Sequence, residues 1–258
     1  MFDVEKTKKE LKENIPEIIY YRETDSTNQR AKEYAKVFRE RRESVVFIAD
    51  SQTAGRGRLG RRFHSADGAG LYITFLLYPD MDAASAIYFT PYAAVKLSEA
   101  VEETAGLFPR IKWVNDLYIN GKKLAGILVE SQTREDGKID YLICGLGINV
   151  YKTTFPQEIS DVAISIEEVA NKRISRETIA STLIEKILSD LGEMASKKNH
   201  DEYERRLTTI GKDVTVIKPT EKYDARVKKL NPDYSLTLSL PDGSEEILFT
   251  GEVGIKNK

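Results

Sequence analysis

Cysteine and histidine are scarce in this chain of 258 residues, which contains one cysteine and two histidines. With Cys144 alone, the chain can form no internal disulfide and no zinc site that needs several cysteines. His64 and His200 lie far apart in the sequence and show no metal-ligand spacing. This composition is typical of a protein from a reducing compartment.

Long apolar runs are also missing. The most apolar stretch, residues 71–78, is far too short to cross a membrane, and the charged residues 1–12 lack the apolar core of a signal peptide. Neither sign of charge is in excess, because 39 basic and 41 acidic residues leave a formal net charge of −2. This balance excludes a globally basic nucleic-acid binder. We therefore expect a cytoplasmic protein that binds neither membranes nor DNA.

The segments that are present predict an α+β protein. Hydrophobic residues make up 41% of the chain, which is enough to build a core at this length. Periodicity and turn residues predict strands at 18–20, 44–50, 71–78, 110–119, 122–131 and 139–150, and helices at 31–38, 90–106 and 177–195. Asn120-Gly121 predicts a tight hairpin between the two strands that it joins. We expect a mixed, mostly antiparallel sheet with helices, preceded by a charged lead-in over residues 1–17.

The sequence pattern changes after Gly211. Val214 and Val216 alternate with polar residues, and Pro241-Asp242-Gly243 predicts a turn between later strands. We therefore expect a large domain over residues 1–210 and a small all-β domain over residues 211–258.

The segment 51–70 is the most unusual part of the chain, with five glycines and no regular periodicity. Residues 55–62 (GRGRLGRR) contain four arginines, and no acidic residue lies between Ser51 and Ala66. Glycines let the backbone approach a ligand closely, and guanidinium groups pair with phosphate or carboxylate oxygens. We interpret this segment as a binding loop for an anionic ligand.

Other interpretations of this loop are a solvated basic segment and a nucleic-acid patch. Gly55, Gly57 and Gly60 also match the dinucleotide fingerprint GxGxxG. A Rossmann turn is rejected, because no helix is predicted after these glycines.

Two further clusters carry polar groups. Ser26-Thr27-Asn28 stands at a predicted helix start, where such residues usually serve as caps. Residues 112–116 (KWVND) and 123–128 (KLAGIL) place lysines in otherwise apolar strands, where an ammonium group needs a partner. Asp116 could be that partner, a magnesium ligand or a turn residue.

In this order, the segments resemble the biotin protein ligase family over residues 18–258. The matching segments are Ser26-Thr27-Asn28, Gln52 with residues 55–61, residues 112–116, residues 123–128, residues 145–150 (GLGINV) and the tail 211–258. The chain departs from the family pattern at Phe63, where tryptophan is usual, at Ser65-Ala66, where Ser-Pro is usual, and at Val114, where proline is frequent. At most 25 residues precede Ser26, which resembles the monofunctional class without an N-terminal DNA-binding domain.

The resemblance implies a class II synthetase-like (biotin/lipoyl ligase) fold with a small SH3-like β-barrel at the C-terminus. The implied reaction is the ATP-dependent biotinylation of a lysine on a biotin carboxyl carrier protein through biotinyl-5′-AMP. ATP, biotin and Mg²⁺ would take part. Members of the family often form homodimers in which the sheets of two subunits join, so the resemblance also allows a homodimer. The alternatives are a lipoate or octanoate ligase or transferase of the same fold, a non-catalytic biotin sensor and a nucleic-acid-binding module.

The resemblance also implies roles for individual residues. The expected catalytic residues are Arg56, Lys123, Asp116 and Lys112, with Asp116 also as the magnesium ligand. The expected ligand-binding residues are Ser26, Thr27, Asn28, Gln52, Gly55, Arg56, Gly57, Arg58, Arg61, Asn115, Lys123, Gly126, Gly147 and Asn149.

Overall fold

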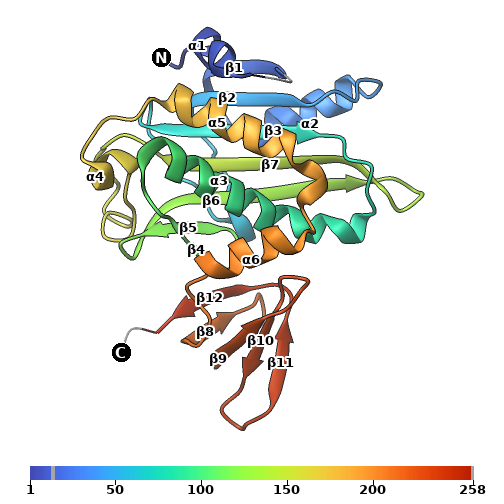
Figure 1. Cartoon of the computed structure of the whole chain (residues 1–258), viewed down its shortest axis with the longest axis vertical. Helices are drawn as coiled ribbons and strands as arrows, with labels where there is room; N and C mark the ends of the chain where they lie inside the picture. The colour runs from blue at the N-terminus through green and yellow to red at the C-terminus, as the bar shows by residue number, and fades with distance from the viewer. Residues whose placement is uncertain (13–14, 257–258) are drawn as a thin grey trace.

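A seven-stranded sheet forms the body of the molecule, in a computed structural model that describes residues 1–12 and 15–256 (Figure 1). The strands, in spatial order, are β1 (Glu17–Thr24), β2 (Val45–Gln52), β3 (Gly70–Leu77), β7 (Ile139–Asn149), β6 (Lys122–Thr133), β5 (Asp116–Ile119) and β4 (Arg110–Lys112). Strands β1 and β2 run parallel, and all other neighbouring pairs in this sheet are antiparallel. The predicted α+β class with a mixed, mostly antiparallel sheet is confirmed.

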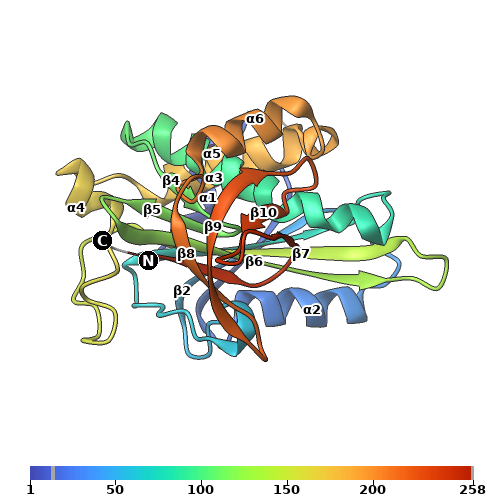
Figure 2. The ribbon, with the colours of Figure 1, turned by 90° about the horizontal axis from the view of Figure 1, so that it is seen from below.

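Helices cover the two faces of this sheet differently (Figure 2). One face carries α2 (Thr27–Val37), which packs on β2, β3 and β7. The opposite face carries α3 (Phe89–Ala105) and α5 (Arg176–Ser189), with α1 (Val4–Glu10) against α5 and α6 (Lys197–Arg206) against α3. The short α4 (Ile166–Ala170) follows β7 in the chain. No helix in the described residues is long and apolar enough to span a membrane.

Local signals in the sequence set several helix boundaries. Gly106 ends α3 with a φ of 69°, a left-handed conformation that glycine adopts without strain. The side chain of Ser175 accepts a hydrogen bond from the backbone N–H of Thr178 and so caps α5, as predicted. The helix predicted over 177–195 is too long, because α5 ends at Ser189 and residues 191–193 form a separate 3-10 turn.

Two other predictions are wrong. The expected lead-in over residues 1–17 contains α1, which is capped by Asp3 and flanked by the buried side chains of Phe2 and Leu11. The single strand expected over 110–119 is instead β4 and β5, which pair with each other across a turn. Trp113 lies buried in that turn, and its indole N–H donates to the backbone oxygen of Tyr234 at 2.8 Å. Nothing in the local sequence around Trp113 predicts this long-range contact.

The C-terminal residues form a second, antiparallel sheet of five strands. Its strands are β8 (Asp213–Ile217), β9 (Lys222–Leu230), β10 (Leu236–Ser239), β11 (Glu245–Leu248) and β12 (Glu252–Ile255), in the spatial order β11-β10-β9-β8-β12. This sheet is consistent with the expected SH3-like module. The domain boundary between residues 210 and 211 stays a prediction.

A buried ion pair joins β2 and the start of β3 to α5. Arg176 on α5 contacts Asp50 on β2 at 2.8 Å, and both side chains are at most 4% exposed. Tyr20 donates to the same carboxylate at 2.6 Å, and Arg176 also donates to the backbone oxygen of Gly70 at 3.1 Å. Burial raises the pKa of Asp50, but the Tyr20 hydrogen bond and the Arg176 charge outweigh it, so this pKa lies below its ordinary value.

Replacing Arg176 by methionine is expected to lower the free energy of unfolding by about 3–5 kcal/mol at neutral pH, because Asp50 is left buried without its partner. In the wild type, the lowered pKa of Asp50 contributes stability above the unfolded-state pKa, and this contribution is lost as the pH falls through the folded-state pKa. The difference between variant and wild type should therefore shrink below about pH 4. Urea unfolding at neutral pH and below about pH 4 measures this difference in the free energy of unfolding. An equal difference at the two pH values would contradict the prediction.

Candidate active site

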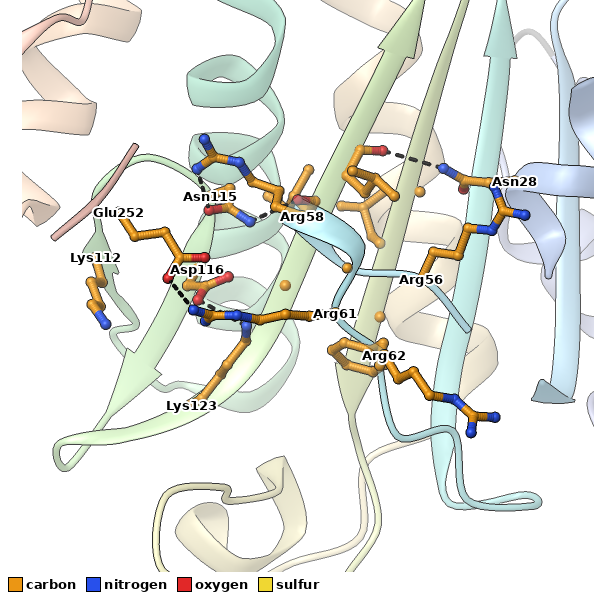
Figure 3. A pocket seen from close by; sticks show the side chains of 18 of the residues that line it. Asn28, Arg56, Arg58, Arg61, Arg62, Lys112, Asn115, Asp116, Lys123 and Glu252 are labelled. Carbon is orange, nitrogen blue, oxygen red and sulfur yellow. Dashed lines mark hydrogen bonds and ion pairs between the residues drawn. The ribbon is translucent and has the colours of Figure 1, made fainter. Parts of the chain in front are cut away.

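A pocket lies on the α2 face of the large sheet, beside the N-terminus of that helix (Figure 3). The strand register sets two rows of neighbouring residues here, Thr74–Gly145–Leu128 and Tyr72–Gly147–Gly126–Asp116. Three of these positions are glycines, so a ligand can approach the backbone of the central strands closely.

The glycines are needed for the side chains that lie over them. A Cβ atom on Gly145 would overlap the side-chain oxygen of Asn28. A Cβ atom on Gly147 would come within 2.5 Å of the Phe63 ring. Both positions therefore let segments from outside the sheet pack directly on β7.

The first residues of α2 line the pocket. Ser26 is the N-cap residue, but its side chain makes no capping hydrogen bond. Instead, Gln52 Oε1 accepts from the backbone N–H of Thr27 at 2.9 Å and lies 3.1 Å from its hydroxyl. Gln52 Nε2 donates to Ser65 Oγ at 3.0 Å, so one side chain joins the helix to the arginine-rich loop. The partial positive charge of such a helix end favours an anionic ligand.

Lys123 and Asp116 form an ion pair inside the pocket, with Lys123 Nζ 2.8 Å from Asp116 Oδ2. A β-bulge between β5 and β6 places Tyr118 opposite Lys123 and Asp116 opposite Gly126, which brings the lysine and the carboxylate to the same face. Of the three roles open for Asp116, that of the lysine's partner is thus confirmed. Asp116 Oδ1 is buried and has no hydrogen-bond partner in the described part of the chain.

Two arginines of the loop reach the C-terminal sheet. Arg58 donates to Asn115 Oδ1 at 3.1 Å and to the backbone oxygen of Gly251 at 3.3 Å. Arg61 pairs with Glu252 on β12 at 2.6 Å. The C-terminal sheet therefore forms one wall of the pocket.

Arg56 differs from its neighbours in the loop. Among residues 1–12 and 15–256, its guanidinium group has no ion-pair partner within 4.0 Å and no hydrogen bond. Figure 3 shows this side chain turned toward Asn28 and away from the Lys123–Asp116 pair. Arg62 donates to the backbone oxygen of Thr53 at 2.7 Å. Arg56 is thus the loop cation that is free to meet a ligand.

The pocket brings together most of the residues predicted from the sequence. Its lining includes Ser26, Thr27, Asn28, Gln52, Arg56, Gly57, Arg58, Arg61, Lys112, Asn115, Asp116, Lys123, Gly126 and Gly147. Gly55 and Asn149 are not among the lining residues. Gly55 packs closely on the Phe63 backbone, and Asn149 donates to the backbone oxygen of Ile164 at 3.2 Å. Their roles in ligand binding stay predictions.

The lining also includes residues that the sequence did not single out as ligand contacts. Glu252 and Val253 come from β12, far along the chain from the loop that they meet, and only the fold brings them there. Tyr118 faces Lys112, whose Nζ lies 5.6 Å from the ring centre. Burial raises the pKa of Tyr118 to about 12, with Asp116 adding to the effect, so its phenol stays protonated at neutral pH.

The residues 1–12 and 15–256 contain no group of three or more histidine, cysteine, aspartate or glutamate side chains that could hold a metal ion. Asp116 is the carboxylate that lies beside Lys123 in the pocket. A metal held here would depend mainly on oxygens of a bound ligand.

Comparison with known proteins gives a family and a fold. Residues 20–149 match the sequence profile of the Biotin/lipoate A/B protein ligase family. Over 161 residues the chain is 40% identical to the Bifunctional ligase/repressor BirA of Bacillus subtilis, and this match covers 62% of the chain and 49% of that protein. The chain spans about half the length of this curated relative. It is also 29% identical over 183 residues to the Biotin--[acetyl-CoA-carboxylase] ligase of Mycobacterium tuberculosis, covering 69% of the chain and 66% of that protein.

The whole fold is similar to a solved structure, the biotin protein ligase from Aquifex aeolicus in complex with biotin and ATP. The TM-score is 0.78 at 28% sequence identity, and the match covers 95% of this chain and 100% of the other. The similarity therefore includes both sheets.

Proposed function

Because the chain belongs to the biotin/lipoate A/B protein ligase family, we propose that it attaches biotin to a lysine of an acceptor protein at the expense of ATP. The similarity to relatives named as biotin ligases, and to a ligase structure that holds biotin and ATP, supports biotin over lipoate. The acceptor would be a biotin carboxyl carrier protein or domain.

The excess of positive charge in the pocket is the observation that carries this proposal. The lining contains six cationic side chains, Arg56, Arg58, Arg61, Arg62, Lys112 and Lys123, and two carboxylates, Asp116 and Glu252. The chain as a whole has a net charge of −2. A site with this local charge suits a reaction in which one anion must approach another.

The first step joins two such anions. The biotin carboxylate oxygen attacks the α-phosphorus of ATP, the bond to the β-phosphate oxygen breaks, and biotinyl-5′-AMP and pyrophosphate form. Arg56 and Lys123 would neutralise the carboxylate and the α-phosphate and hold them in line. Arg58 and Arg61 would hold the remaining phosphates.

In the second step the acceptor lysine amine attacks the acyl carbon of the mixed anhydride. An amide forms, the bond between the acyl carbon and the phosphate oxygen breaks so that AMP leaves, and the nitrogen loses one proton to the solvent. No nucleophile from the ligase is required, which agrees with a pocket lining that has neither cysteine nor histidine. Asp116, with Asn115 and Lys112 close by, would orient the incoming lysine amine.

A magnesium ion would fit beside Asp116. The Oδ1 atom of this residue is buried and has no hydrogen-bond partner in the described residues, so a lone pair is available. Mg²⁺ at nucleotide sites is commonly held by one or two carboxylates together with phosphate oxygens and water. When bound, the ion would neutralise phosphate charge.

The decisive experiment measures pyrophosphate release from ATP with biotin, lipoate or octanoate, followed by mass spectrometry of an added biotin carrier domain. Release with biotin alone, and a mass gain on the carrier lysine, is the expected result. Release with lipoate or octanoate would move the protein to the sister activity. Biotin binding without any turnover would indicate a sensor and would overturn the proposal.

A further inference from the structure

The amide of Asn28 is held from both ends by residues of the large sheet, and its Nδ2 also donates weakly to the backbone oxygen of Leu128 at 3.5 Å. Its Oδ1 accepts from the hydroxyl of Thr74 at 2.8 Å, and its Nδ2 donates to Glu130 Oε2 at 3.0 Å. Thr74 is fully buried on β3, and Glu130 lies on β6. Neither residue is among those that line the pocket.

The charge of Glu130 decides which way this amide points. Burial raises the pKa of Glu130, but hydrogen bonds from Lys32 and Asn28 outweigh it and leave the pKa below its ordinary value. The ion pair with Lys32 is short, at 2.6 Å. An ionised carboxylate can only accept hydrogen bonds, so it must face the NH₂ group of Asn28, and the amide oxygen must face the other way.

This orientation determines what Asn28 can offer to a ligand. Its oxygen lies directly over Gly145, where a Cβ atom would overlap it, and Thr74 occupies one of its two lone pairs. One lone pair is left, and Gly145, over which the oxygen lies, is among the residues that line the pocket. The ring of biotin carries two urea N–H donors, whereas the dithiolane ring of lipoate carries none.

We propose that Glu130 is a positioning residue that fixes the Asn28 amide with its oxygen over Gly145, a residue that lines the pocket, and so tunes the site for a ring bearing N–H donors. This inference rests on the proposed function. Glu130 does not touch the ligand, and it acts through Asn28.

The test is Glu130→Gln, whose amide can donate as well as accept and so no longer fixes Asn28. We expect the dissociation constant for biotin, measured by calorimetry without ATP, to rise about 10-fold. The rate of pyrophosphate release at saturating biotin should stay within about two-fold, so that KM rises while kcat does not. Thr74→Val, which is nearly isosteric and frees the other end of the amide, should also weaken biotin binding, although it removes the contact of Thr74 with the Thr27 hydroxyl at 2.7 Å as well.

A double-mutant cycle separates positioning from a general loss of structure. In the Asn28→Ala background, Glu130→Gln should change biotin affinity by less than about two-fold, because the group it acts through is gone. Glu33→Gln is the matched control, since it removes a Glu–Arg pair from α2 at a residue that does not line the pocket. It should leave biotin affinity unchanged.

Two results would overturn the inference: an unchanged dissociation constant in Glu130→Gln, or an equal loss in the presence and absence of Asn28. If the wild-type chain itself binds no biotin, the proposed function fails and the inference fails with it. If the wild type binds biotin and Glu130→Gln binds it equally well, only the inference fails.

Discussion

Replacing Lys123 by methionine is expected to slow biotin-dependent pyrophosphate release about 10²–10³-fold, the usual cost of losing one group that stabilises developing charge. Methionine keeps much of the length of the side chain but removes the ammonium group that lies 2.8 Å from Asp116. The reacting anions then face an uncompensated carboxylate instead of a neutralised one. Stopped assays of pyrophosphate at saturating ATP measure the effect.

The control for this variant is Lys122→Met. Lys122 is the neighbouring residue on β6 and does not line the pocket, so its replacement removes the same charge from the chain without touching the site. It should retain wild-type activity. Equal rates in Lys123→Met and the wild type would remove Lys123 from the proposed chemistry.

The second large effect is expected for Gly145→Ala. The added methyl group would overlap Asn28 Oδ1, so either the N-terminus of α2 or strand β7 must shift. Displacing a ligand-binding side chain by about 1 Å can cost about 10²-fold in rate, and overpacking typically costs about 1–3 kcal/mol of stability. Assays of pyrophosphate release, calorimetry with biotin and thermal unfolding measure the effects on rate, biotin affinity and stability separately.

Gly192→Ala is the matched control, because nothing lies within 4 Å of a Cβ atom built at Gly192. It should leave both biotin affinity and the melting temperature close to those of the wild type. A Gly145→Ala variant with wild-type affinity would show that the contact between Asn28 and β7 can relax without consequence.

The site was predictable from the sequence where its residues are close in the chain and carry their own chemistry. The arginines of residues 55–62 stand among glycines without nearby acids, and Lys123 and Asp116 stand in apolar strands. Each pattern is anomalous unless a ligand or partner explains it, and the structure brings these residues into one pocket.

The residues that escaped prediction depend on strand register or on contacts across the chain. Glu130 and Thr74 are unremarkable members of their strands, and only the register of β3, β7 and β6 brings them to Asn28. The turn between β4 and β5 is likewise fixed by the contact of Trp113 with Tyr234. Local periodicity contains no information on such pairs.

The ion pair between Arg61 and Glu252 also has a consequence for how the molecule folds. It closes a loop that includes most of the chain. Closing such a long loop costs chain entropy before the contact contributes any stabilisation. We therefore expect each of the two sheets to form first. The contact between the arginine-rich loop and β12 should form last. A nascent chain still on the ribosome would already contain the arginine-rich loop, but its anionic ligand would meet a site open on one side until β12 had been synthesised and docked.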